Sequence, residues 1–296
     1  MELHQIKYFL AVVRYRHFTR AARHCQVAQP SLSQQIKKLE RELGQPLFDR
    51  AGKKVLMTDA GSRFLEKANA VLAAIEDARK AVAADDGALG TLNIGAIPTI
   101  APYVLPPLIK SFNRLRPGAQ VQIMEDITEH LVRACLEGEI DAAILALPID
   151  APLLESEAIF TEPLLLAMPK NHALARRKNI NIADLQDQPF VLLDPVHCLG
   201  SQVLNFCRDK HCLPLVRCRS SQLLTVQEMV GLGMGISLIP QMAARADDGR
   251  KCCYRELSAP APARIIGICR HRRRFESRLL KDFLNLARRP SGTMPD

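Results

Sequence analysis

The chain has 296 residues and carries 40 Lys and Arg against 31 Asp and Glu, a formal net charge of +9. This length suits two or three domains of ordinary size. Hydrophobic residues make up 48% and charged residues 24%, which excludes a disordered or fibrous protein. No apolar run approaches the ~18 residues of a membrane span, and the first residues lack the features of a signal peptide, so we expect a cytoplasmic protein.

The positive charge is concentrated at the N-terminus. Residues 1–58 hold 11 Lys and Arg against 4 Asp and Glu, a net charge of +7, whereas residues 59–90 carry −2 and residues 91–296 carry +4. A compact basic segment on a nearly neutral body is typical of proteins that bind the phosphate backbone of nucleic acid. The sequence therefore predicts a nucleic-acid-binding module in the first 58 residues.

Three helices are predicted in this module, at 3–13, Phe18–His24 and Gln29–Leu43, followed by a strand, a basic turn and a second strand over 47–58. In the third helix one stripe is apolar and predicted to be buried: Leu32, Ile36, Leu39 and Leu43. The opposite face is polar and basic: Ser31, Ser33, Gln34, Lys37, Lys38 and Arg41. Short polar side chains at a helix start reach base edges in the major groove while cations hold phosphates. A solvated amphipathic face is the alternative interpretation.

The segment from Asp59 to about Ala84 predicts one long helix. Its apolar residues are spaced 4, 3, 4, 3 and 4 apart: Phe64, Ala68, Val71, Ile75, Ala78 and Val82. This alternation is typical of a coiled-coil seam and predicts a homodimer. A dimer has the twofold axis needed to bind a pseudo-palindromic DNA site. We assign residues 59–88 to this dimerising linker.

Residues 91–296 alternate between strand and helix patterns, which predicts a parallel sheet with covering helices in two lobes that face across a cleft. Strands are expected at 91–97, 121–125, 142–147, 164–168, 190–193, 236–239 and 265–269, and helices at 105–115, 129–137, 199–210 and 222–232. The glycines of 231–235 follow a helix and precede a strand, the reverse of a dinucleotide-binding loop, so no cofactor is expected.

The N-terminal motif resembles the winged helix-turn-helix of LysR-type transcriptional regulators. The resemblance rests on Ala21-Ala22, on the run from Val27 to Glu40, and on Leu43-Gly44 with 47–50. It implies a reader domain (1–58), a linker helix (59–88) and a two-lobed effector domain like a periplasmic binding protein (91–296). It also implies a homodimer or homotetramer that acts as an activator, with RNA polymerase as a possible partner. The DNA contacts that it implies are Gln29, Pro30, Ser31, Ser33, Gln34, Lys37 and Arg50.

A second stretch resembles the peroxide-sensing OxyR branch of that family, where a cysteine after a histidine is oxidised and then captured by a second cysteine nine positions on. His197, Cys198 and Cys207 have that arrangement. The resemblance implies that Cys198 is the sensing thiol and that Cys207 forms a disulfide with it. One position departs from the branch, because Ser201 stands where an acidic residue is usual.

The same resemblance implies a pocket around the thiol. The stretches 97–99 and 127–130 are similar to those that bring two threonines, here Thr99 and Thr128, to the sensing cysteine, and Arg270 falls where a basic residue lies near it. Peroxide reacts with a thiolate, so the dipole of a helix that starts near Cys198 and the charge of Arg270 are expected to favour the anion.

Three alternatives remain open from the sequence. A LysR-type regulator can respond to a small organic effector bound between the lobes, with Thr99 and Thr128 as its polar ligands. A thiol peroxidase using Cys198 is disfavoured by the DNA-binding module, so we do not expect an enzyme. A zinc site from Cys207, His211, Cys212 and Cys218, or from Cys252 and Cys253, fits no standard ligand spacing, and no metal is expected. Cys25, Cys135 and Cys269 lie on apolar stretches and are predicted to be buried structural thiols.

Overall fold

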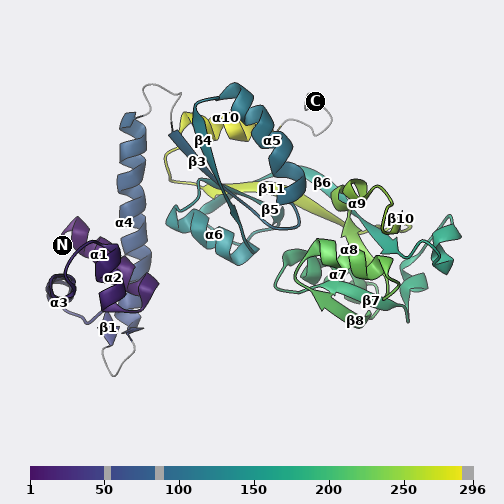
Figure 1. Ribbon diagram of the computed structural model, residues 1–296, viewed down its shortest axis with the longest axis horizontal. Helices are drawn as coiled ribbons and strands as arrows, with labels where there is room; N and C mark the ends of the chain where they lie inside the picture. Colours follow the sequence, from purple (N-terminus) through teal and green to yellow (C-terminus); the bar gives the residue numbers. More distant parts are fainter. Residues whose placement is uncertain (50–54, 84–89, 289–296) are drawn as a thin grey trace. The chain divides into compact units, whose positions relative to one another are not determined.

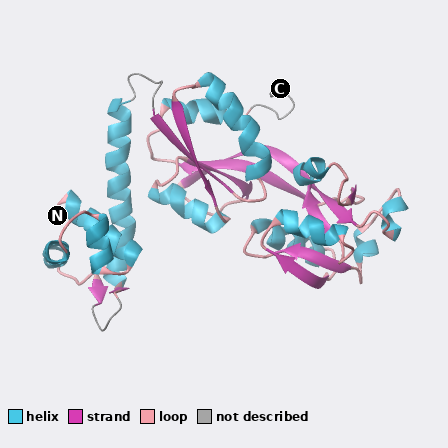
Figure 2. Cartoon of the chain, viewed as in Figure 1, coloured by secondary structure: helices cyan, strands magenta, loops and turns pink. Residues whose placement is uncertain are grey.

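The computed structural model describes residues 1–49, 55–83 and 90–288 (Figure 1). The chain divides into two compact units, Met1–Ala83 and Ala84–Asp296. Unit 1 is mostly helical, whereas unit 2 combines strands with helices (Figure 2). None of the helices in the described residues is both long and apolar enough to cross a membrane.

Unit 1 is a winged helix-turn-helix followed by a long helix. Its elements are α1 (Leu3–Tyr15), α2 (Phe18–His24), α3 (Gln29–Leu43), β1 (Phe48–Asp49), β2 (Leu56–Met57) and α4 (Asp59–Ala83). The strands β1 and β2 pair antiparallel, with Phe48 opposite Met57. The α3 helix ends at Gly44, whose φ of 68° is the left-handed conformation that glycine adopts without strain.

The apolar stripe of α3 packs into the core of unit 1. Leu32, Ile36 and Leu39 are fully buried. Leu43 was predicted to extend this stripe, but it is 37% exposed because it lies in the last turn of α3. The Glu40 side chain accepts hydrogen bonds from the backbone N–H groups of Leu47 and Phe48, at 2.9 and 3.2 Å. These bonds fix the first strand of the wing against α3.

The seam of α4 is buried over only half of its length. Ala68 is buried and Phe64 packs against the core of unit 1, whereas Val71 is 40% exposed and Val82 is 83% exposed. The C-terminal half of α4 therefore carries an apolar stripe that the described residues of this unit do not cover.

Unit 2 is built on a mixed sheet rather than the parallel sheet that was predicted. Its helices are α5 (Ala101–Leu115), α6 (Thr128–Glu137), α7 (Cys198–Asp209), α8 (Leu223–Gly231), α9 (Gln241–Asp247) and α10 (Arg278–Ala287), with short 3₁₀ turns at Ala173–Arg176 and Ile182–Leu185. Its strands are β3 (Gly90–Ala96), β4 (Ala119–Glu125), β5 (Ala142–Leu147), β6 (Leu154–Met168), β7 (Pro189–Leu193), β8 (Leu215–Ser220), β9 (Ser237–Pro240), β10 (Cys253–Arg255) and β11 (Ala263–His271).

The order β10-β6-β11-β5-β3-β4 explains this difference. The strands β4, β3 and β5 are parallel, but β11 runs antiparallel to both β5 and β6, and β9 and β10 pair antiparallel with β6. The chain returns through the sheet in β6 and again in β11, so these long strands enter both lobes (Figure 1). A separate parallel pair, β7 and β8, completes the second lobe.

Two cores define the lobes. Lobe I contains α5, α6 and α10 around β3, β4 and β5, with Ile94, Phe112 and Phe283 in its core. Lobe II contains α7, α8 and α9 around β7, β8 and β9, with Phe190 and Val230 in its core. The strand β6 contributes residues to both cores, such as Leu154 to lobe I and Leu166 to lobe II, so the lobes are joined by continuous sheet.

Candidate functional sites: an exposed helix face and a buried thiol

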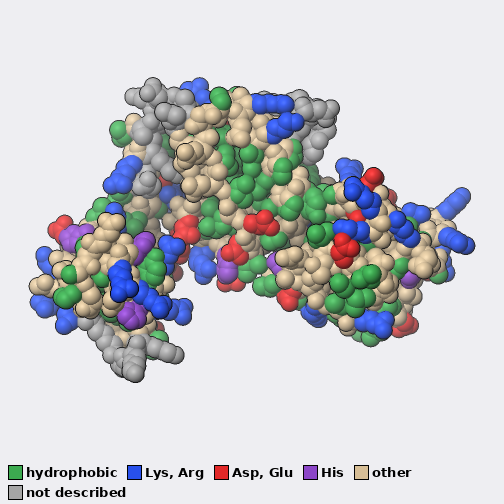
Figure 3. Space-filling view, in the orientation of Figure 1, with side chains coloured by type: hydrophobic (Ala, Val, Ile, Leu, Met, Phe, Trp, Pro, Cys, Tyr) green, Lys and Arg blue, Asp and Glu red, His purple; other side chains and the backbone are tan. Residues whose placement is uncertain are grey.

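The first candidate site is the polar face of α3. Gln29, Pro30, Ser31, Gln34 and Lys37 are exposed. Ser33 is half-buried, and Lys38 and Arg41 are exposed on later turns. Lys and Arg side chains are prominent on the visible surface of unit 1 (Figure 3). Arg50, which was predicted to approach DNA, lies outside the described residues. The α3 helix thus offers short polar groups at its start and cations along its later turns.

The second candidate site is Cys198, the first residue of α7. His197, half-buried, is the N-cap of this helix. Although α7 belongs to lobe II, Cys198 packs against the core of lobe I. Thr128, the first residue of α6 in lobe I, lies within hydrogen-bonding reach of this thiol. The thiol therefore lies where the two lobes meet, at the start of two helices.

Burial raises the pKa of the Cys198 thiol above its ordinary value. Four smaller effects favour the thiolate: a hydrogen bond from Thr128, the charge of Arg264, and the backbone N–H groups of Leu199 and of Cys198 itself. The expected contribution of the helix start is present, but burial outweighs it. The resting thiol is therefore protonated, with donors aimed at the anion.

The Thr128 hydroxyl is a buried polar group that lacks a regular hydrogen-bond partner among the described residues. Its Oγ1 is buried and makes no hydrogen bond of normal geometry in the described part of the chain. It nevertheless lies close enough to Cys198 to lower the pKa of the thiol by donating to the thiolate. A buried hydroxyl without a partner is costly, by about 1–3 kcal/mol. A thiolate, or a peroxide at the thiol, would supply the missing partner.

The positive charge near the thiol belongs to a buried ion pair. Arg264 in β11 donates from Nε to Glu162 Oε2 in β6 at 2.7 Å, and its Nη2 lies 2.7 Å from the same oxygen. The same guanidinium donates to Thr99 Oγ1 at 2.9 Å and to the Thr99 carbonyl oxygen at 3.1 Å. Glu162 Oε1 accepts from the backbone N–H of Met242 in lobe II at 2.9 Å. Each charge is thus paired and hydrogen-bonded.

These contacts concern two residues that the sequence assigned to the pocket, Arg270 and Thr99. Arg270 was expected to supply the charge, but its guanidinium pairs with Glu155 at 2.9 Å and with Glu276. Arg264 and Arg270 lie six residues apart on one strand, roughly 20 Å at ~3.3 Å per residue, and the charge that favours the Cys198 thiolate is that of Arg264. Thr99, the other threonine of the predicted pocket, accepts a hydrogen bond at its hydroxyl from Arg264, the cation whose charge favours the Cys198 thiolate.

Cys207 lies in the last turns of α7 and is fully buried in the core of lobe II. Burial, and secondarily the neighbouring Cys212, raises its pKa to about 12. Nine residues at ~1.5 Å rise separate Cys198 and Cys207 by roughly 13 Å along the helix. A disulfide needs Cα atoms within ~7 Å, so this pair can join only if α7 unwinds.

All nine cysteines are free thiols in this structure. Cys135 and Cys269 are buried in lobe I, and burial raises the pKa of Cys135 to about 12, which makes it unreactive. Cys25 is partly buried in unit 1. Across the described ranges, no three His, Cys, Asp or Glu side chains gather as a metal site.

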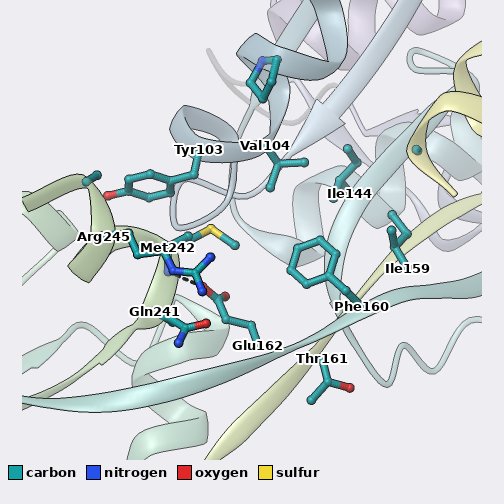
Figure 4. Close-up of a pocket in the computed structure, with 13 residues that line it drawn as sticks. Tyr103, Val104, Ile144, Ile159, Phe160, Thr161, Glu162, Gln241, Met242 and Arg245 are labelled. Carbon is teal, nitrogen blue, oxygen red and sulfur yellow. Dashed lines mark hydrogen bonds between the residues drawn. The ribbon is translucent and has the colours of Figure 1, made fainter. Parts of the chain in front are cut away.

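A separate cavity of about 580 Å³ is lined in part by Glu162, the acidic member of the ion pair (Figure 4). Tyr103 and Val104 of α5, Phe160 and Glu162 of β6, and Arg245 of α9 are among its lining residues. Cys198 and Thr128 do not line it. The cavity therefore borders the Glu162 side of the ion pair and is distinct from the surroundings of the thiol.

Arg264 and Glu162 were missed from the sequence. Each stands immediately before or within an apolar run, Ile265–Cys269 and 163–168 respectively, and resembles a charge at a strand end. The sequence indicated only that two opposite charges stand next to segments predicted to be strands. Their pairing depends on β6 and β11 being antiparallel neighbours, which periodicity does not reveal.

Both units of the chain match known protein families. Residues 3–62 match the family described as bacterial regulatory helix-turn-helix protein, lysR family, and residues 85–290 match the LysR substrate binding domain. The chain is 36% identical over 273 residues to the DNA-binding transcriptional dual regulator OxyR of Escherichia coli K12, covering 90% of this chain and 88% of that protein.

Two solved structures extend this similarity. A full-length OxyR variant from Pseudomonas aeruginosa superposes with a TM-score of 0.80 at 32% identity, covering 98% of this chain and 96% of that one. A Corynebacterium glutamicum OxyR cysteine variant with hydrogen peroxide bound gives a TM-score of 0.63 at 30% identity, covering 97% and 93%. With both family matches and this coverage, the chain belongs to the LysR family of bacterial helix-turn-helix transcription regulators.

Proposed function

We propose that this regulator senses peroxide through Cys198 and switches by forming a Cys198–Cys207 disulfide. The observation that carries the proposal is the position of Cys198 at the start of α7, with the unpartnered Thr128 hydroxyl and the Arg264 charge directed at its anion. The similarity to OxyR proteins, one of them with peroxide bound, supports the same chemistry.

The chemistry balances with the residues present. The Cys198 thiolate attacks one peroxide oxygen, the O–O bond breaks, and the leaving hydroxide takes a proton to become water. The Thr128 hydroxyl donates to the anion or to the peroxide, and Arg264 stabilises the negative charge. Cys207 then attacks the sulfur of the sulfenic acid, and a second water leaves as the disulfide forms.

Disulfide formation is the structural switch in this proposal. Because α7 holds the two thiols apart, the disulfide requires the helix to unwind and Cys207 to leave the core of lobe II. Loss of α7 also removes Cys198 from the junction with lobe I. The proposed outcome is a change in how the two lobes pack, which alters the DNA-binding assembly.

The DNA-binding assembly is proposed to be a homodimer, joined through the exposed seam of α4 and paired again into a homotetramer. Gln29, Pro30, Ser31, Ser33, Gln34, Lys37 and Arg50 are the proposed contacts to a pseudo-palindromic operator. We further propose that the protein acts in the cytoplasm as an activator in contact with RNA polymerase. The exposure of α3 and of Val71 and Val82 supports these interfaces.

A small organic effector is the second candidate signal. The observation in its favour is the cavity of about 580 Å³, whose apolar walls and few polar groups suit a compact organic molecule. Because Glu162 borders the cavity, such a ligand would act on the ion pair rather than on Thr128, which the sequence had suggested as a ligand.

Replacing both proposed redox cysteines one at a time tests the switch. Cys198→Ser is expected to abolish any change in operator affinity on addition of peroxide, because no sulfenic acid forms. Cys207→Ser is expected to form the sulfenic acid without the disulfide and to over-oxidise. Thiol labelling and operator titration before and after peroxide measure both. A wild-type Cys198 that stays fully alkylatable while DNA binding still responds to a metabolite would instead support the effector cavity.

The Thr128 hydroxyl is expected to control thiol reactivity without supporting the fold. Thr128→Val removes the donor to the thiolate, so the pKa of Cys198 rises and the alkylation-rate profile shifts to higher pH. Because Thr128 Oγ1 is buried without a regular partner, the free energy of unfolding should not fall. Thr128→Ser keeps the hydroxyl and is the control. Identical pH profiles for all three proteins would remove Thr128 from the site.

The α3 face is tested by separating base contacts from phosphate contacts. Gln29→Ala is expected to reduce discrimination between operator and random DNA by about 1–3 kcal/mol. Lys37→Ala should weaken binding to both DNAs and reduce the salt dependence. Lys170→Ala, an exposed cation of unit 2, is the matched control for charge. Equal losses on both DNAs for Gln29→Ala would argue against base recognition by that residue.

The α4 seam is tested by introducing charge. Replacing Val71 and Ile75 together with Asp places uncompensated carboxylates in the proposed helix pair, at a cost of several kcal/mol, and should dissociate the dimer. Light scattering reports the mass, and operator titration reports the linked loss of affinity. An unchanged mass for the double variant contradicts dimerisation through this seam.

A further inference from the structure

A third cysteine lies against the proposed resolving thiol. The α7 helix ends in two hydrogen bonds that define a Schellman motif: the backbone N–H of His211 donates to the Arg208 carbonyl oxygen at 3.0 Å, and that of Cys212 donates to the Cys207 carbonyl oxygen at 2.9 Å. His211 has the left-handed φ of 55° that the motif requires. In this motif the side chains at the two ends of the wider turn, five positions apart in the chain, frequently contact each other.

Cys207 and Cys212 occupy those two positions. Both are buried in the core of lobe II, with 0% and 3% of their surface exposed. The closeness of the two thiols also affects their ionisation, because the charge of Cys212 contributes to raising the pKa of Cys207. In the folded protein, the thiol that Cys207 meets is therefore Cys212, while Cys198 lies at the far end of the helix.

We propose that Cys212 is a second resolving thiol, which takes Cys207 out of the Cys198–Cys207 disulfide and leaves a Cys207–Cys212 disulfide in its place. This inference rests on the proposed peroxide chemistry, which supplies the first disulfide. The Cys212 thiolate attacks the sulfur of Cys207, the bond between Cys198 and Cys207 breaks, and the electron pair leaves on Cys198 as a thiolate. The exchange involves no further oxidation, since the single peroxide has already accepted the two electrons.

The direction of the exchange follows from the helix. A Cys198–Cys207 disulfide exists only while α7 is unwound, whereas Cys207 and Cys212 are neighbours in the folded helix terminus. Transfer therefore lets α7 refold. Cys212 also has the opportunity to react, because the unwinding that removes Cys207 from lobe II exposes this turn. Arg208 and Lys210 then lie beside both thiols and favour their thiolates.

The consequence is that the Cys198–Cys207 state ends without a reductant, whereas the Cys207–Cys212 disulfide must be reduced before the switch can act again. Once Cys207 is joined to Cys212, Cys198 returns to the junction of the lobes as a free thiol and the protein regains its reduced fold around α7. The Cys198–Cys207 form becomes a transient state whose lifetime Cys212 sets.

Trypsin separates the two disulfides cleanly. Residues 179–208 form one peptide that contains Cys198 and Cys207, and residues 211–217 form a second that contains Cys212. The full-length wild type is treated with one equivalent of hydrogen peroxide, quenched with acid at successive times, alkylated and digested without reduction. We expect an internal disulfide in peptide 179–208 first, followed by a cross-linked pair of peptides in which fragmentation finds the alkyl group on Cys198.

Cysteine variants test whether Cys212 carries out the disulfide exchange. Cys212→Ser and Cys212→Ala should both accumulate the internal disulfide, with a lifetime several-fold longer than in the wild type and a correspondingly longer change in operator affinity. Cys198→Ser should give no cross-linked pair. A wild type that holds only the internal disulfide, with Cys212 fully alkylated, overturns this inference alone, as does a cross-linked pair with the alkyl group on Cys207. A wild type with both cysteines of peptide 179–208 alkylated at all times contradicts the proposed function itself.

Discussion

The buried pair of Arg264 and Glu162 is the interaction on which the effector domain depends. Neither side chain has appreciable contact with water, so each charge persists only because the other, together with Thr99 and the Met242 backbone, satisfies it. Removing one partner of such a pair typically costs about 3–5 kcal/mol. The pair also joins β6 to β11 where the strands pass between the lobes, and it fixes Thr99 of lobe I and α9 of lobe II to one point. The ion pair therefore links the two lobes at their junction and supplies one of the effects that favour the Cys198 thiolate.

The α7 helix adds a second constraint, because it holds its two ends in different environments. Its start packs on lobe I through Cys198, and its end lies in the core of lobe II through Cys207. Gly200 permits this placement, since a Cβ there would lie 2.4 Å from the Leu193 carbonyl oxygen. A helix and a Cys198–Cys207 disulfide are mutually exclusive, so in the proposed mechanism covalent chemistry at one residue acts on the packing of both lobes. This incompatibility of two local structures is what makes a switch with two states rather than a graded response.

Much of the architecture was predictable because it depends on local pattern. The bounds of α2 and α3 agree with those expected from apolar spacing, and the start of α7 at Cys198 lies one residue from its predicted place. The features that the sequence did not predict depend on pairing between distant segments. The sheet is mixed because β11 returns antiparallel, the charge at the thiol comes from Arg264 rather than Arg270, and the β8, β10, α9 and α10 elements were not anticipated. Leu43 fits the apolar spacing of α3 but lies beyond the reach of the core. Periodicity identifies faces, whereas a site assembled from four elements requires the topology.

The balance of effects on Cys198 explains how a sensor can remain inert until its signal arrives. Burial makes the thiolate unfavourable at rest, which protects the sulfur from oxidants and metals that need an exposed anion. The Thr128 hydroxyl, the helix start and Arg264 are fixed in place before any charge forms, so they stabilise the anion without the cost of reorganising. A small neutral oxidant that reaches the junction of the lobes would meet donors already oriented, and the negative charge that develops during its reduction would strengthen each contact. In this arrangement selectivity comes from stabilising the reaction more than the resting thiol.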